Sequence, residues 1–165
     1  MSCSRRQRGF VVALLIVGLA FGAMAVLPGS VAAQGFAGGD GSDGNPHEIE
    51  NWTHLDNVRD DLSENYTLVA DLDESTAGYD NVANSTANSY KGFDPIGDFT
   101  SKFNGTSDGN GFVISNLSID RDSDYIGLFG SIGTGGQIEN VALEEVQVSG
   151  ENYVGRLVGI KAGGT

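Results

Sequence analysis

The spacing of apolar residues divides the chain into regions of different character. A continuous apolar run covers residues 10–27. Over residues 49–62, apolar residues recur every three or four positions, the period of an amphipathic helix, and Thr53 is expected to cap its start. Residues 66–72 alternate apolar and polar side chains, which predicts a β-strand. Residues 73–92 are polar and are predicted to form a long loop.

Beyond residue 93 the chain contains short β signals separated by glycines. Apolar clusters recur over 112–119, 125–130, 138–148 and 153–159. Strands this short do not build a broad open sheet. They suit a solenoid, in which each coil contributes a few residues and then turns sharply.

Two of these clusters repeat internally. Ile-x-Asn-apolar-x-apolar occurs at 114–119 and again at 138–143, an offset of 24 residues (138 − 114). Tyr-apolar-Gly begins at residue 125 and again at 153, an offset of 28 (153 − 125). Such periods indicate a repeat architecture and predict a parallel β-helix whose equivalent residues stack about 4.8 Å apart. The expected structural repeat positions are Gly127, Gly130, Gly155, Gly159, Asn116 and Asn140.

The first 33 residues have the three parts of a secretory signal peptide. Three arginines precede the apolar run, and Val31-Ala-Ala33 offers small residues to a signal peptidase. We expect cleavage after Ala33, then a flexible Gly-rich linker over 34–46 and a folded domain over 47–165. The alternative is an uncleaved membrane anchor, because the 18 positions of the run (27 − 10 + 1) are just enough to span a bilayer. Export by the general or the twin-arginine route stays open.

Charge predicts a secreted or cell-surface protein of a saline medium. The chain has 22 acidic and 9 basic residues, and three of the basic ones precede the cleavage site, so the mature charge is −16 (6 − 22). This charge disfavours nucleic acid as a partner, and it leaves membrane contact to the signal or anchor segment. Strong salt screens the self-repulsion, which predicts a halophilic origin; an ordinary acidic secreted protein is the alternative. The only cysteine, Cys3, lies in the signal.

Few residues suggest a metal site. Asp120, Asp122 and Asp124 alternate as in a calcium loop, so they are the candidates for Ca²⁺, but the glycine and glutamate of an EF-hand are missing downstream. His47 and His54 are predicted to be solvated residues near a helix start rather than metal ligands. No cofactor is otherwise expected.

Sequons for N-glycosylation are frequent in the mature chain. The polar segment makes Asn84 the best candidate, whereas the repeat already explains Asn116. The candidates are Asn51, Asn65, Asn84, Asn104 and Asn116.

The order of the motifs resembles the GLUG-motif proteins of bacterial and archaeal cell surfaces. Residues 127–130 (Gly-Leu-Phe-Gly) and 153–159 resemble the signature repeat of that family, and residues 93–117 are similar to the segment that precedes it. The likeness covers about residues 48–165. It implies a right-handed parallel β-helix, secreted or displayed, often in an adhesin-like protein, with no catalytic residues. Arg156 stands where a second glycine is usual, and we expect it to be exposed.

We therefore predict an all-β protein, a parallel β-helix of few coils with a short N-terminal helix and an open C-terminal end. The predicted function is a non-enzymatic surface module for adhesion or envelope contacts, with surface glycans or envelope proteins as partners. One alternative is a polysaccharide-active enzyme, or its accessory domain, on the same fold. No carboxylate pair of the kind that glycosidases use stands out. Another alternative is a truncated fragment of a larger surface protein.

Overall fold

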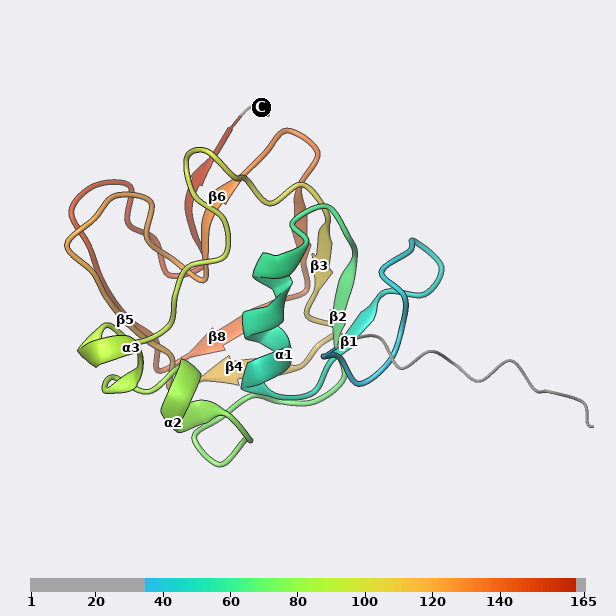
Figure 1. Cartoon of the computed structure of the whole chain (residues 1–165), viewed down its shortest axis with the longest axis horizontal. Helices are drawn as coiled ribbons and strands as arrows, with labels where there is room; N and C mark the ends of the chain where they lie inside the picture. The colour runs from blue at the N-terminus through green and yellow to red at the C-terminus, as the bar shows by residue number, and fades with distance from the viewer. Residues whose placement is uncertain (1–34, 163–165) are drawn as a thin grey trace, which may run out of the picture. The chain divides into compact units, whose positions relative to one another are not determined.

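The computed structural model describes residues 35–162. The predicted signal peptide and its cleavage site lie outside the described residues. The described part consists mainly of short β-strands with a few short helices (Figure 1), so the all-β prediction is confirmed in this broad form. The strands are β1 (His47–Ile49), β2 (Tyr66–Leu68), β3 (Thr106–Asp108), β4 (Val113–Ser115), β5 (Ser118–Asp120), β6 (Phe129–Ile132), β7 (Gln137–Glu139), β8 (Ala142–Glu144), β9 (Gln147–Ser149) and β10 (Val158–Lys161). The helices are α1 (Trp52–Asn57), α2 (Tyr79–Val82) and α3 (Ala87–Tyr90), with a 3-10 turn, η1, at Val58–Asp60.

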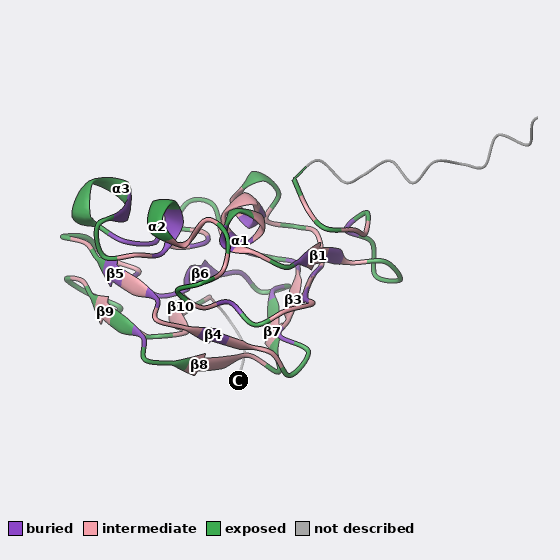
Figure 2. Cartoon of the chain, turned by 90° about the horizontal axis from the view of Figure 1, so that it is seen from below, coloured by how far each residue is buried: buried purple, intermediate pink, exposed green. Residues whose placement is uncertain are grey.

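The strands pair in parallel between successive passes of the chain. We call residues 66–105 the first pass, 106–133 the second and 134–162 the third. β2 of the first pass pairs with β3 of the second, which pairs with β7 of the third; β1 lies on the other side of β2. β4–β8, β5–β9 and β6–β10 each join the second pass to the third. Figure 2 shows β7, β8 and β9 as one layer, with the helices on the opposite side of the strands.

The register corrects the predicted offset of 24 residues. Ile114 pairs with Leu143, an offset of 29 (143 − 114), so Asn140 does not lie opposite Asn116. Both asparagines have a left-handed backbone, with φ values of 59° and 50°, and Glu145 shares it. Asparagine tolerates this conformation better than most residues. The motif therefore recurs because several corners of the chain need such a residue, not because the two segments stack.

The second predicted offset, from Tyr125 to Tyr153, is confirmed. Ile126 forms a parallel bridge with Val154, one residue further along each segment. A Cβ placed on Gly127 would lie 2.6 Å from the carbonyl oxygen of Gly155. The second and third passes approach each other too closely here to leave room for a side chain, so position 127 requires a glycine.

The core lies between the passes and beneath α1. The core contains five large rings that are fully buried. The centroid of the Phe103 ring lies 6.2 Å from that of Tyr66 and 5.0 Å from that of Phe129. The buried rings are Trp52, Tyr66, Phe93, Phe103 and Phe129.

The N-terminal helix is shorter than predicted, and another residue caps it. Ile49 belongs to β1 rather than to the helix. The side-chain oxygen of Asn51 accepts a hydrogen bond from the His54 N–H at 2.9 Å, so Asn51 is the N-cap and the prediction of Thr53 is wrong. The predicted loop over 73–92 contains α2 and α3.

Residues 35–46 differ from the predicted flexible linker, because they bind to the free edge of β1. The Ala37 N–H donates to the Glu48 carbonyl, and the Glu48 N–H donates to the Gly38 carbonyl, both at 2.9 Å. Phe36 stacks on His47 with ring centroids 4.3 Å apart. A glycine-rich composition did not reveal this pairing, since backbone groups provide the hydrogen bonds.

Candidate functional site

Three aromatic rings, one from each pass, form a stacked row on the surface. The ring of Phe99 lies 5.6 Å from that of Tyr125, and the ring of Tyr125 lies 5.0 Å from that of Tyr153. Phe99 is 61% exposed and Tyr153 is 54% exposed, whereas Tyr125 between them is half-buried. We call these three residues the aromatic ladder. Large exposed apolar groups that gather in one place are typical of interaction sites.

The register of the passes produces the ladder. Tyr125 and Tyr153 both have a left-handed backbone, with φ values of 64° and 55°, directly before the bridge between Ile126 and Val154. The same backbone at equivalent positions directs both side chains the same way, and their rings are parallel, with an interplanar angle of 0°. At the other end of the ladder, the Lys102 ammonium lies 4.9 Å from the centroid of the Phe99 ring, within reach of a cation–π contact.

A cleft of about 280 Å³ beside the ladder is lined by three acidic residues and by Arg59. Asp94, Asp98 and Asp124 contribute carboxylates, and Tyr125 forms part of the wall. Hydrogen bonds from the Thr100 hydroxyl and then from backbone N–H groups hold the pKa of Asp98 below its usual value of 3.8. The carboxylate is therefore charged at neutral pH. The cleft presents hydrogen-bond acceptors next to aromatic carbon.

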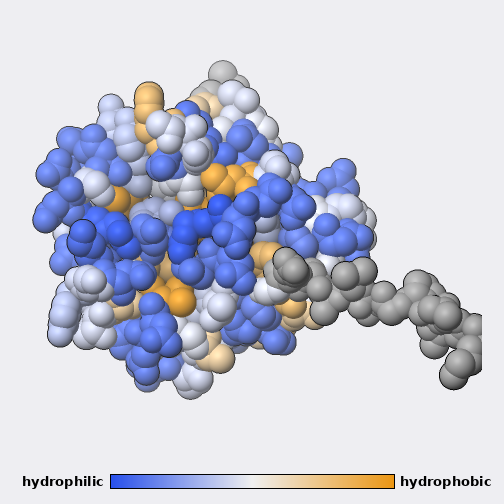
Figure 3. Space-filling view, in the orientation of Figure 1, coloured by the Kyte–Doolittle hydropathy of each residue, from blue (hydrophilic) through white to orange (hydrophobic). Residues whose placement is uncertain are grey.

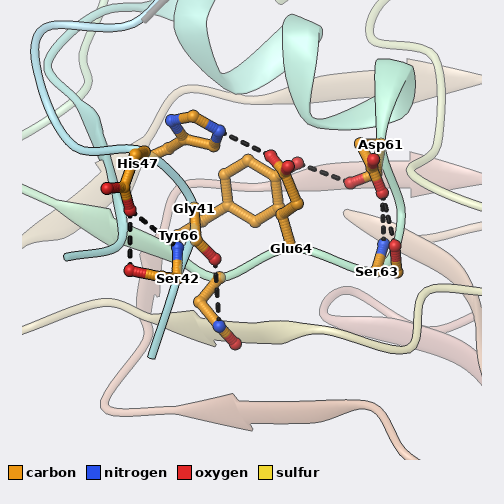
Figure 4. Close-up of polar contacts among 9 residues, drawn as sticks. Gly41, Ser42, His47, Asp61, Ser63, Glu64 and Tyr66 are labelled. Carbon is orange, nitrogen blue, oxygen red and sulfur yellow. Dashed lines mark hydrogen bonds and ion pairs between the residues drawn. The ribbon is translucent and has the colours of Figure 1, made fainter. Parts of the chain in front are cut away.

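A second cluster surrounds His47 at the edge of β1 (Figure 4). The Nε2 atom of His47 lies 2.5 Å from a carboxylate oxygen of Glu64, and the His47 side chain is only 10% exposed. The Tyr66 hydroxyl donates to the Asp61 carbonyl at 2.5 Å. Burial, reinforced by the nearby carboxylates of Glu64 and Asp61, raises the pKa of Tyr66. This cluster fastens β1 to the turn before β2, and the stacked Phe36 covers it.

The histidines differ from their predicted solvated state. His47 is buried in the cluster just described. His54 is half-buried in α1, and burial lowers the pKa of its imidazole despite the opposing charge of Glu50.

The calcium prediction at Asp120, Asp122 and Asp124 finds no support in the structure. Within residues 35–162, no three acidic, histidine or cysteine side chains are placed to hold a metal ion. Asp120 ends β5, and the Asp124 carboxylate accepts a hydrogen bond from the Asn152 side chain at 2.7 Å. Ca²⁺ binding at these three carboxylates therefore stays a prediction.

The sequon asparagines differ in how far their side chains are engaged. Asn65 donates to the Gly41 carbonyl and to Asp43, and its side-chain oxygen accepts from the Thr106 N–H. Asn51 caps α1, and Asn84 caps a turn by accepting from Thr86. The remaining two are Asn104, which is exposed, and Asn116, which is half-buried with a left-handed backbone.

Sequence reasoning predicted none of the three ladder residues as site residues, and Phe99 is the one for which the sequence contained no signal. The equivalence of Tyr125 and Tyr153 was visible in the sequence, and it could have suggested a stacked pair. Phe99 lies in an Asp-Phe-Thr-Ser segment that does not repeat the Tyr-apolar-Gly pattern. Arg156 is exposed, as predicted, and lines a cleft of about 580 Å³ together with Asp120.

Comparison with known proteins places similar sequences in much longer chains. The chain is 39% identical over 132 residues to a protein named Halomucin from Haloquadratum walsbyi, and the matched segment covers 76% of this chain and 1% of that protein. It is 42% identical over 130 residues to a putative Gly-rich membrane protein from Evansella cellulosilytica, covering 75% of this chain and 14% of that one. No protein-family model and no solved structure matches the chain. The resemblance to GLUG-motif proteins thus stays a prediction.

The helices of the described region give no membrane span. Among residues 35–162, none combines the length and the apolar character that crossing a bilayer needs. The apolar run over 10–27 lies outside the described residues.

Proposed function

We propose that this protein is a non-enzymatic module of the cell surface or extracellular space that binds a glycan at the aromatic ladder. The stacked passes would form a short parallel β-solenoid that displays the ladder. The observation that carries the proposal is the row of Phe99, Tyr125 and Tyr153, one ring from each pass, with its outer members more than half exposed.

The chemistry of the ladder and its cleft suits a sugar. An aromatic face is negatively polarised and attracts the C–H groups of a sugar ring, while the cleft carboxylates can accept hydrogen bonds from its hydroxyls. A neutral glycan also avoids the repulsion that a chain of net charge −13 exerts on an anionic ligand. A few convergent polar groups beside aromatic carbon are typical of small-ligand sites.

The relatives support the proposed location. One is named Halomucin and the other a putative Gly-rich membrane protein, and both names fit a surface or membrane-associated role. The acidic composition supports a saline environment, because salt screens the repulsion within the chain.

Binding to polysaccharides tests the proposal. We expect the exported protein to be retarded in gels that contain one of a panel of purified neutral polysaccharides, and Tyr153→Ala to weaken that binding about tenfold or more. Tyr90→Ala is the matched control, because Tyr90 is 77% exposed but lies outside the ladder. Failure to bind any polysaccharide, or an equal loss in both variants, would contradict the proposal.

A carbohydrate-active enzyme on the same scaffold remains the second candidate from the sequence. Glycoside hydrolysis generally uses two carboxyl groups that flank the scissile bond. Asp120 supplies the one carboxylate among the residues that line the cleft of about 580 Å³. This cleft therefore lacks the pair of carboxyl groups that glycoside hydrolysis generally needs, and the proposal of binding concerns the other cleft, beside the ladder.

A further inference from the structure

The chain contains two Asn-Gly dipeptides, at 104–105 and 110–111. In such a dipeptide the backbone nitrogen of the glycine can attack the side-chain amide of the asparagine, because glycine has no Cβ to hinder the approach. The reaction needs a glycine nitrogen that is able to move toward that side chain. The two dipeptides differ in this respect.

Gly105 is held in place by its neighbours. Its N–H donates to the Leu62 carbonyl at 3.1 Å, and the residue is buried. A Cβ on Gly105 would collide with the Glu64 carbonyl oxygen. Moving the Gly105 nitrogen toward the side chain of Asn104 would therefore break a hydrogen bond and disturb close packing.

Gly111, by contrast, lies at the tip of an exposed turn between β3 and β4. The Phe112 N–H donates to the Gly109 carbonyl at 2.8 Å, and the central residues Asn110 and Gly111 have φ values of 51° and 82°. Positive φ at both central positions is the mark of a type I′ turn, in which Asn-Gly is preferred. Both residues are exposed, and a Cβ on Gly111 would meet nothing within 4 Å. This turn is therefore able to open locally without disturbing the packing of the passes.

We propose that Asn110 is a site of spontaneous deamidation in the folded protein. The Gly111 nitrogen loses its proton to a base in solution and bonds to Cγ of Asn110, while the bond from Cγ to Nδ2 breaks and ammonia leaves. Water then opens the resulting cyclic imide at one of its two C–N bonds. The products are aspartate, with the original backbone, and isoaspartate, in which the backbone runs through the side-chain carbon.

The modification removes a contact between two passes. Nδ2 of Asn110 donates to the Leu68 carbonyl at 3.3 Å, at the end of β2 in the first pass. A carboxylate has no proton to donate. Its charge also comes close to the carboxylate of Asp108, which already accepts the Asn110 N–H at 2.8 Å. Both products therefore loosen the corner between β3 and β4.

The modified protein is expected to stay folded and to differ in charge. Because Asn110 is exposed, the new carboxylate stays in water. A further surface charge suits this molecule, since the face drawn in Figure 3 is already largely hydrophilic with small apolar areas. The net charge of −13 becomes more negative by one for each modified chain, so an anion exchanger separates modified from unmodified molecules.

Peptide mapping by mass spectrometry tests the proposal on the exported protein, incubated in high salt at neutral and at alkaline pH for increasing times. We expect Asn110 to exchange its amide for a carboxyl group several-fold faster than Asn104, and faster at alkaline pH. In urea the two rates should converge, because unfolding frees Gly105 from its contacts. An equal or faster reaction of Asn104 in the folded protein, or an unreactive Asn110, would overturn the proposal.

Matched alanine variants locate the reacting nitrogen. Gly111→Ala places a methyl group beside it and should slow the appearance of the acidic form several-fold, whereas Gly44→Ala, at another exposed glycine with open space around it, should leave the rate unchanged. Circular dichroism checks that both variants fold. If Gly111→Ala does not fold, Asn110→Gln replaces it, because the longer side chain forms the cyclic imide much more slowly. An acidic form that appears at the wild-type rate in the folded variant would contradict the assignment to Asn110.

Discussion

At the scale of single residues, aspartates that fix tight turns recur along the chain. Each accepts hydrogen bonds from the backbone N–H and the hydroxyl of the residue two positions on, and these bonds hold the carboxyl pKa below its usual value. Such turns fix the loops that connect the short strands. The aspartates are Asp40, Asp61, Asp73 and Asp98.

Acid should remove the contribution that Asp98, which borders the ladder cleft, makes to the stability of the fold. Its pKa is depressed in the folded state, so its stabilising effect is present above its usual value of 3.8 and is lost as pH falls through the lower folded value. Thr100→Val removes the hydroxyl that contributes most to this shift. We expect the melting temperature of this variant to lie below that of the wild type at pH 7 and the two to converge in acid.

Thermal melts between about pH 7 and pH 2 measure this effect. Thr134→Val is a suitable control, because Thr134 is exposed and lies outside the turn in which Thr100 and Ser101 donate to Asp98. If the melting temperatures of Thr100→Val and Thr134→Val change with pH in the same way, the Asp98 turn does not stabilise the fold as described.

At the scale of elements, the residue that caps α1 differs from the residue that the sequence pattern predicted. Asn51→Ala should lower the free energy of unfolding by about 1 kcal/mol, because it removes the acceptor for the His54 N–H. Thr53→Ala tests the residue that the sequence favoured, and it should change stability much less. Urea unfolding of the two variants measures both, and a larger loss for Thr53→Ala would contradict the assignment.

The elements could be predicted from sequence better than their pairing. The helical period and the alternation after residue 66 each located an element. Burying one face of a helix or strand requires apolar residues at a regular spacing, and this spacing is visible in the local sequence. The register in which two strands pair produces no such pattern within either strand alone. Asn116 and Asn140 looked equivalent because turns select asparagine, and only the bridges between passes show the offset of 29.

At the scale of the whole molecule, the candidate site is a consequence of stacking. Phe99, Tyr125 and Tyr153 are distant in sequence, and three passes bring them into one row. The shared motif aligned Tyr125 with Tyr153 in the sequence, although neither was predicted as a site residue. It could not indicate the third, because the first pass, with α2 and α3, is longer and follows a different pattern.

The central claim is that the passes stack in register at close distance, and Gly159 tests it most directly. A Cβ on Gly159 would lie 2.6 Å from the Gly130 carbonyl oxygen in the neighbouring pass, whereas one on Gly44 would meet nothing within 4 Å. We would measure the free energy of unfolding of Gly159→Ala and Gly44→Ala in high salt. The account predicts a loss of about 1–3 kcal/mol for Gly159→Ala. For Gly44→Ala it predicts no change, or a gain of up to about 1 kcal/mol. Equal stability of the two variants would contradict the stacking of the passes.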